Sequence, residues 1–159
     1  MAYIALLLSV AVVAADQICR ILAVEYLKPV GTIPIIKGLL DFRYIENTGA
    51  AFSILQDQRW FFVTVTAVIC VLVVFALFRY HRHEFFSYGA SILILGGGIG
   101  NLIDRVFYGY VVDYIRISFF PAIFNFSDCC ITVGALFLIV HVLFYMEGNG
   151  GAEKVLRTK

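Results

Sequence analysis

Residues 61–78 read FFVTVTAVICVLVVFALF, a continuous apolar run without a single charged side chain. A helix that crosses a lipid bilayer needs about 20 consecutive, mostly apolar residues, and this run approaches that length. The whole chain shares the bias, because 62% of its 159 residues are hydrophobic and only 14% are charged. Soluble domains carry about 25% charged residues. The composition therefore indicates an integral membrane protein.

Three further windows are long and apolar enough to span a membrane. The window 3–24 is interrupted by a few polar residues, 85–103 is uncharged and rich in glycine, and 129–146 contains only His141 as a histidine or charged residue. The first window resembles a signal peptide in position, but it lacks a basic beginning and a clean small-residue cleavage site. We therefore predict that it is a retained helix and that the membrane domain has four crossings.

Lysine and arginine residues set the expected orientation. Short connections rich in these residues stay on the cytoplasmic side of a membrane. The connection 79–84 and the tail 147–159 hold them densely, at Arg79, Arg82, Lys154, Arg157 and Lys159. We therefore expect both termini in the cytoplasm and the long connections, 25–60 and 104–128, on the extracytoplasmic side. Residues 1–146 form one membrane domain in this prediction, and 147–159 form a flexible cytoplasmic tail.

The connection 25–60 is expected to hold a small β-like platform. Residues 41–44, Asp-Phe-Arg-Tyr, alternate polar and apolar side chains, which is typical of a short strand. Asn47 and Gly49 then supply a turn. The other interpretation is an irregular but ordered loop. The predicted fold class is an all-α membrane protein, with four transmembrane helices and a small β-like extracytoplasmic platform.

Ionisable residues in membrane helices are candidates for function, because an unpaired charge there costs free energy. Asp16 and Arg20 are spaced i, i+4 on the first helix, so they are expected to pair as structural polar support. Their pairing could also simply neutralise the end of the helix.

The stretch GGGIGNLIDR, residues 96–105, ends the third predicted helix. Gly96 and Gly100 form a step of small residues that allows another helix to approach closely. Asn101 and Arg105 are again spaced i, i+4, so they can present donors in one direction. Asp104 points elsewhere and could orient Arg105 or cap a neighbouring group. The alternative is a packed helix end whose arginine reaches the interface.

Two acids lie near the start of the last apolar window, Asp113 in GYVVDYI and Asp128 in FNFSD. Asn125 precedes Asp128 by three residues and could donate a hydrogen bond to it. Two carboxylates brought together cannot both ionise cheaply, so they share a proton and titrate as a unit. Such a pair suits peptide hydrolysis, because one carboxylate takes a proton from water while the other polarises the carbonyl. The alternative is two separate acids, each capped by backbone amides.

Other classes of function are less well supported by these residues. The net charge is +1 and no basic, aromatic-interleaved patch is present, so no nucleic-acid partner is expected. A transporter would place ionisable residues near the membrane midplane in several helices, and a non-catalytic scaffold would leave the acid pair unexplained. The cysteines lack metal-ligand spacing, so we expect inert, buried side chains and no metal or cofactor; they are Cys19, Cys70, Cys129 and Cys130.

Five blocks in this order resemble the bacterial lipoprotein signal peptidases, also called signal peptidase II. The blocks are DQICR (16–20), NTGAAFS (47–53), GGGIGNLIDR (96–105), GYVVDY (109–114) and FNFSD (124–128). The resemblance covers nearly the whole chain. It implies an aspartic endopeptidase in the bacterial cytoplasmic (inner) membrane, which removes the signal peptide from diacylglyceryl-modified prolipoproteins and cuts just before the lipidated cysteine. The implied partners are this lipid-modified substrate and membrane lipids, and we expect a monomer.

The resemblance also assigns roles to residues. Asp113 and Asp128 match the catalytic pair near the extracytoplasmic face. Positions that bind substrate or shape the site are matched by Asn47, Asn101, Arg105 and Asn125, and Asp16 and Arg20 match a pair near the end of the first helix. We add Gly49, beside Asn47, to the site-shaping residues and count Asp16, Arg20 and Asp104 as structural polar support. Two residues differ from the family's usual pattern. Arg20 replaces a lysine, and a planar guanidinium is not equivalent to an ammonium group. Ser127 replaces an alanine and adds a hydroxyl beside Asp128.

Overall fold

Four long helices form the body of the protein in a computed structural model that describes residues 1–49, 57–80 and 84–146. Helix α1 (Ala2–Leu22) continues into the π-helical turn η1 (Ala23–Leu27). Helix α2 is Arg59–Arg79 and α3 is Phe85–Phe107. Helix α4 (Phe126–His141) continues into η3 (Val142–Met146). Each of the four is long and apolar enough to cross a membrane, which confirms the predicted spans.

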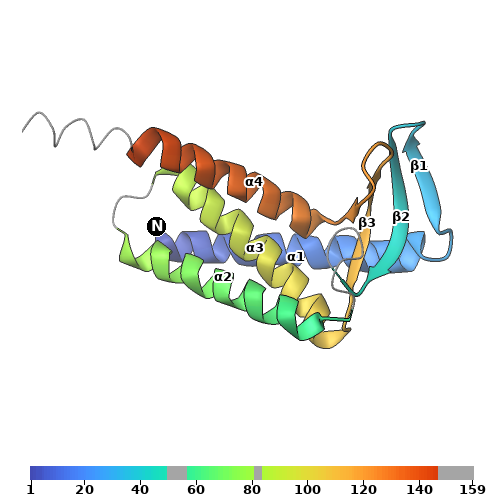
Figure 1. Cartoon of the computed structure of the whole chain (residues 1–159), viewed down its shortest axis with the longest axis horizontal. Coiled ribbons are helices and arrows are strands. Elements are labelled where there is room, and N and C mark those ends of the chain that lie inside the picture. The colour runs from blue at the N-terminus through green and yellow to red at the C-terminus, as the bar shows by residue number, and fades with distance from the viewer. Residues whose placement is uncertain (50–56, 81–83, 147–159) are drawn as a thin grey trace, which may run out of the picture.

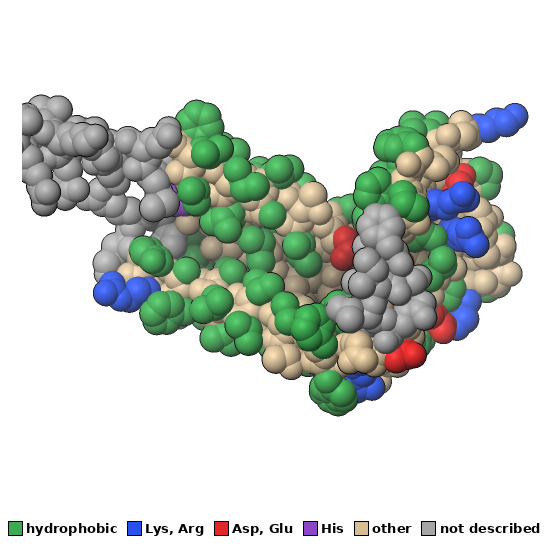
Figure 2. All heavy atoms as spheres, viewed as in Figure 1, with side chains coloured by type: hydrophobic (Ala, Val, Ile, Leu, Met, Phe, Trp, Pro, Cys, Tyr) green, Lys and Arg blue, Asp and Glu red, His purple; other side chains and the backbone are tan. Residues whose placement is uncertain are grey.

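The outer surface of these helices is apolar. Helix α2 buries only Cys70 and Leu77, while large side chains such as Val71 and Phe75 are 66% and 62% exposed. Hydrophobic side chains cover the visible face of the helical body, whereas most charged side chains gather at the end that carries the sheet (Figure 2). An apolar surface of this extent is typical of contact with lipid rather than water.

Helix α3 lies at the centre of the bundle and contacts the other three helices. Its glycines allow this close packing. A Cβ atom at Gly96 would meet the side chain of Val12, and one at Gly100 would lie 2.6 Å from Oδ2 of Asp16. The predicted step of small residues therefore brings α3 against α1, because a larger residue at either position would displace the neighbouring helix.

A four-stranded antiparallel sheet lies beyond one end of the bundle (Figure 1). Its strands are β1 (Thr32–Ile36), β2 (Leu40–Asn47), β3 (Val111–Ile117) and β4 (Ile123–Phe124), in the order β1-β2-β3-β4. The predicted strand at 41–44 is part of β2. The prediction placed the sheet in the connection 25–60 alone, whereas β3 and β4 come from the second long connection. The structure corrects that point.

The sheet is attached to the bundle through the extension of α1. A cluster of buried residues joins Ala23 and Leu27 of η1 to Val112 and Tyr114 of β3. The N-terminus and the end of α4 lie together at the opposite end of the bundle from the sheet (Figure 1). This agrees with the four predicted crossings. The predicted tail 147–159, residues 50–53 of the NTGAAFS block and residues 81–83 of the basic connection 79–84 lie outside the described residues.

Candidate active site

Asp128 is fixed at the first turn of α4 by a capping box. The side-chain Oδ1 of Asn125 accepts a hydrogen bond from the backbone N–H of Asp128 at 2.9 Å. In return, Oδ2 of Asp128 accepts from the backbone N–H of Asn125 at 3.2 Å. An acid at this position satisfies free backbone donors and interacts favourably with the helix dipole. The motif FNFSD therefore both starts the helix and orients its carboxylate.

Asp113 lies on β3, opposite Ile45 of β2. Its side chain is buried, with only 3% of the residue exposed. Oδ2 accepts a hydrogen bond from Nδ2 of Asn47 at 2.8 Å, and Oδ1 accepts from Nδ2 of Asn125 at 2.6 Å. Burial, followed by the charge of Asp128, raises the pKa of Asp113 to about 6, although the two asparagine donors oppose the shift. Asp113 is therefore able to carry a proton near neutral pH.

One pocket of about 240 Å³ brings the two acids together. Its lining includes four of the predicted site residues, Asn47, Asn101, Arg105 and Asn125, in addition to Asp113 and Asp128. The pocket lies between the start of α4, the end of α3 and the sheet. The space-filling view is hollowed between the sheet and the bundle, and an acidic side chain is visible there (Figure 2). The acids are referred to below as the acid pair.

Asn101 and Arg105 have different partners although they lie on the same face of α3. Nδ2 of Asn101 donates to Oδ1 of Asp128 at 2.9 Å. Nη2 of Arg105 donates to the backbone carbonyl of Gly49 at 3.3 Å, and its guanidinium lies 5.0 Å from the ring centroid of Phe62. Gly49 is not among the lining residues. It supports the site indirectly, because its N–H donates to Oδ1 of Asn47 at 2.9 Å.

The side chain of Asn125 differs from the prediction. Its carboxamide N–H₂ donates to Asp113 and, at 3.3 Å, to Oδ1 of Asn101, rather than to Asp128. Asp128 receives the backbone N–H of Asn125 instead. The reason is the capping geometry, which uses the side-chain oxygen of Asn125 for the backbone of Asp128 and leaves the amide nitrogen free to reach β3. Asn125 therefore links both acids.

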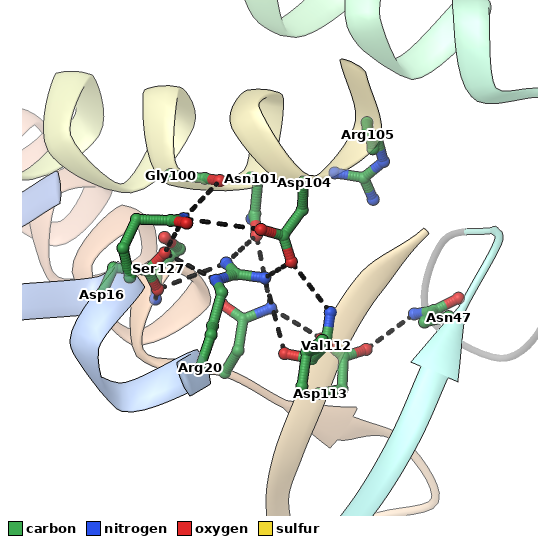
Figure 3. A network of polar contacts seen from close by, with 12 residues as sticks. Asp16, Arg20, Asn47, Gly100, Asn101, Asp104, Arg105, Val112, Asp113 and Ser127 are labelled. Atoms are coloured by element: carbon green, nitrogen blue, oxygen red, sulfur yellow. Dashed lines mark hydrogen bonds and ion pairs between the residues drawn. The ribbon is translucent and has the colours of Figure 1, made fainter. Parts of the chain in front are cut away.

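A second charged group lies behind the pocket and consists of Asp16, Arg20 and Asp104, called here the polar layer (Figure 3). Arg20 pairs with Asp16 at 2.7 Å, as the i, i+4 spacing predicted, and with Asp104 at 2.6 Å. Asp104 was expected to orient Arg105 or to cap a neighbouring group. Asp104 caps a neighbouring group, because its Oδ2 accepts a hydrogen bond from the backbone N–H of Val112 at 3.1 Å.

The prediction missed the apolar wall of the pocket. The lining also contains Val111, Ile123, Phe124, Ile131 and Thr132. Part of this wall follows from periodicity. Ile131 and Thr132 lie three and four positions after Asp128, so they share its helix face. Val111 lies two positions before Asp113 in β3, so the two side chains share one face of the strand. The remainder depends on the pairing of β4 with β3, which no local pattern indicates.

The cysteines form no disulfide among the described residues. Cys70 and Cys130 are buried as expected, and Cys19 is half-buried. Cys129 is exposed, which corrects the prediction that all four are buried. It follows Asp128 by one position, which is a rotation of about 100° around the helix axis. Its side chain therefore turns to the outer surface of α4.

The fold and the pocket define a multi-pass membrane protein that holds two carboxylates, one buried and one half-buried, in a pocket at one end of its helix bundle. Residues 8–144 match the family model described as Signal peptidase (SPase) II. The chain is 44% identical over 133 residues to a lipoprotein signal peptidase of Caldanaerobacter subterraneus, covering 84% of this chain and 91% of that protein. It is 40% identical over 129 residues to one from Streptococcus pyogenes, covering 80% and 85%.

Solved structures agree with these relationships. A bacterial membrane enzyme determined at 2.3 Å superposes with a TM-score of 0.80 and 31% identity, over 87% of each chain. Another, determined at 1.9 Å, gives a TM-score of 0.78 and 30% identity, over 89% of this chain and 93% of that chain. The chain belongs to the signal peptidase II family and is therefore a peptidase of the membrane.

Proposed function

We propose that this protein is an aspartic endopeptidase and that Asp113 and Asp128 are its catalytic residues. The observation that carries the proposal is the environment of the acid pair. Both carboxylates line one pocket, and their hydrogen bonds come from asparagine side chains and backbone amides. Within the described residues, no lysine or arginine forms an ion pair with either acid. Two such groups are most stable when they share one proton.

The shared proton allows acid and base catalysis in the same pocket. The ionised carboxylate removes a proton from a water molecule, whose oxygen attacks the carbonyl carbon of the scissile peptide bond. The protonated carboxyl group donates a hydrogen bond to the carbonyl oxygen and stabilises the tetrahedral intermediate. A proton then passes to the leaving amide nitrogen, the C–N bond breaks, and the pair returns to its singly protonated form. The three asparagines hold the carboxylate oxygens in place throughout, and they are Asn47, Asn101 and Asn125.

We infer that the substrate is a prolipoprotein whose cysteine carries diacylglycerol, cut just before that cysteine. The names of the relatives support a lipoprotein substrate. The pocket offers both chemical environments that this substrate needs, with polar groups at the acid pair and an apolar wall that includes Ile123 and Ile131. A diacylglyceryl cysteine can remain in the bilayer while the peptide bond beside it reaches the acids.

The proposed orientation places both termini in the cytoplasm and the acid pair near the extracytoplasmic face of the bacterial inner membrane. Arg79 at the end of α2 supports it, together with the basic residues of the connection and tail, by the positive-inside rule. The sheet then lies on the extracytoplasmic side. We propose that residues 1–146 act as one domain, as a monomer surrounded by membrane lipids, and that 147–159 form a cytoplasmic tail.

A cleavage assay with purified protein tests the proposed function. Wild-type protein, Asp113→Asn and Asp128→Asn are given one prolipoprotein with and without diacylglycerol on its cysteine, and the products are mapped by mass spectrometry. Wild type cuts only the lipidated form, just before the cysteine, and each variant loses at least about 1,000-fold in turnover. Asp41→Asn is the matched control, because Asp41 lies on β2 in an ion pair with Arg116. Wild-type turnover by either folded pair variant would refute the proposal.

A further inference from the structure

Arg20 is a buried cation whose guanidinium uses several edges at once. Only 3% of the residue is exposed. Nε and Nη2 donate to the two carboxylate oxygens of Asp16 at 2.7 and 3.2 Å, and Nη1 donates to Oδ2 of Asp104 at 2.6 Å. Nη2 also donates to Oδ1 of Asn101 at 2.7 Å. Arg20 does not line the pocket. Its contacts therefore reach the acid pair only through other residues.

The first route leads to Asp128 through the carboxamide of Asn101. A carboxamide has an accepting oxygen at one end and a donating nitrogen at the other. Because Arg20 donates to Oδ1, the nitrogen of Asn101 must face the opposite direction. Nδ2 there donates to Oδ1 of Asp128 at 2.9 Å. Reversing the amide would place its nitrogen against the guanidinium and its oxygen against a carboxylate. The cation thus selects the orientation that supports Asp128.

The second route leads to the strand that carries Asp113. Asp104 accepts from Arg20 and, through the same Oδ2 atom, from the backbone N–H of Val112 at 3.1 Å. Nη1 of Arg20 also lies 3.5 Å from the carbonyl oxygen of Val112. Val112 immediately precedes Asp113 in β3. The guanidinium therefore fixes the backbone on one side of the first acid and the amide that holds the second (Figure 3).

We propose that Arg20 is a positioning residue that aligns both acids from behind, through Asn101 for Asp128 and through Asp104 and Val112 for Asp113. The inference rests on the proposed function of the acid pair. It depends on the shape of the side chain as well as on its charge. A guanidinium presents donors along three edges of a rigid plane, whereas a lysine ammonium concentrates its donors at one nitrogen. A lysine at this position can pair with Asp16 and Asp104. Its single nitrogen cannot at the same time reach Oδ1 of Asn101, as Nη2 of the planar guanidinium does.

The test measures kcat and KM separately for wild type, Arg20→Lys, Asn101→Ala and the double variant. Arg20→Lys keeps the buried charge, so the protein is expected to fold. Its kcat falls about tenfold or more, since small misplacements of catalytic groups cost up to about 100-fold. KM stays within about twofold because Arg20 is outside the pocket. In the Asn101→Ala background the same change lowers kcat by no more than about threefold, because one route is already broken.

Arg59→Lys is the matched control. Arg59 also donates to α3, from Nη2 to the carbonyl of Val106 at 2.9 Å, but none of its contacts with other described residues leads to the acid pair. Its kcat is expected to remain at the wild-type value. The proposal is overturned if Arg20→Lys leaves kcat unchanged, if it changes only KM, or if its effect is the same with and without Asn101.

A second variant covers the case in which Arg20→Lys does not fold. Asp104→Asn keeps Arg20 and its pair with Asp16 but removes the charge that holds Nη1. It is expected to lower kcat with KM unchanged, and an unchanged kcat would overturn the inference. A failure of the positioning role can be told apart from a failure of the proposed function. If the Asp113→Asn and Asp128→Asn variants are inactive while Arg20→Lys and Asp104→Asn are fully active, only the positioning role is wrong.

Discussion

The polar layer and the acid pair each contain two aspartates, but only the polar layer contains a cation that pairs with them. Asp16, Asp104 and Asp113 are buried, and Asp128 is half-buried. In the polar layer, Arg20 compensates Asp16 and Asp104 through ion pairs of 2.7 and 2.6 Å. The acid pair receives neutral donors and faces an open pocket. A buried ion pair can hold one specific arrangement in place, whereas two neighbouring carboxylates that receive only neutral donors can share a proton. The first environment supports the fold and the second supports proton transfer.

The largest expected effect on stability comes from removing the cation of the polar layer. Arg20→Met leaves two buried carboxylates without compensation, so it lowers the free energy of unfolding by about 3–5 kcal/mol. Equilibrium unfolding in mild detergent measures this loss. The control is Arg116→Met, which breaks a partly exposed ion pair at 3.4 Å with Asp41 and costs at most about 1 kcal/mol. Equal losses for the two variants would contradict the difference drawn between the two pairs of acids.

A smaller loss is expected from crowding the contact between α3 and the polar layer. In Gly100→Ala the new Cβ would lie 2.6 Å from Oδ2 of Asp16 and would also meet Oγ of Ser127. Overpacking of this kind lowers the free energy of unfolding by about 1–3 kcal/mol. The loss should shrink when Ser127 is also changed to alanine, because one of the two clashing atoms is removed. An unfolding midpoint equal to that of wild type would show that the groups facing Gly100 do not approach it as closely as the structure places them.

The acid pair should respond through its titration. Asn47→Ala removes a donor to Oδ2 of Asp113, a hydrogen bond that lowers the pKa of that group. The pKa therefore rises above about 6, and the limb of the pH–activity profile that Asp113 governs moves to higher pH. The accompanying loss in kcat/KM is about tenfold, equal to one hydrogen bond of about 1.4 kcal/mol. Profiles of kcat/KM against pH measure both effects.

The control for this titration is the adjacent residue on the same strand. Glu46 is paired with Lys28 at 2.8 Å on the exposed face of β2, so Glu46→Gln should leave the profile unchanged. A shift of the Asn47→Ala profile to lower pH would mean that Asn47 does not stabilise the ionised form of Asp113.

The smallest expected effect is at Ser127, which lies between the polar layer and the acid pair. Its backbone N–H donates to Asp16 at 3.0 Å, but its buried Oγ has no hydrogen-bond partner among the described residues. Ser127→Ala keeps the backbone bond and removes the unsatisfied hydroxyl, so it should raise the free energy of unfolding by about 1 kcal/mol and leave kcat within about twofold. A clear loss of stability would show that the hydroxyl makes a contact of its own.

Local sequence patterns predicted the polar layer better than they predicted the pocket. The pairing of Asp16 with Arg20 follows from helical periodicity. Asp104 joins them from 84 residues away, and only the close approach of α1 and α3 at Gly96 and Gly100 makes that contact. Glycine spacing indicated that such an approach exists but not which side chains meet across it.

The sheet was the least predictable part of the fold. Strand β3 reads VVDYIRI, and its first four residues are all buried, so the alternation that marks a half-exposed strand is absent. Its register against β2, with Ile45 opposite Asp113, is a long-range pairing. The motifs at 109–114 and 124–128 indicated the two acids, yet the role of Asn125 as a link between them depended on that register and on the cap of α4.

Infrared spectroscopy of the acid pair tests the central claim most directly. Wild type and Asp113→Asn, both with labelled aspartate carboxyl groups, are titrated from about pH 4 to about pH 8. Wild type should lose a protonated-carboxyl band with an apparent midpoint near the pKa of about 6 for Asp113, and the variant should lack this transition. A wild-type protein with no carboxyl band titrating in that range, or with the same band in Asp113→Asn, would contradict the shared proton on which the proposed chemistry depends.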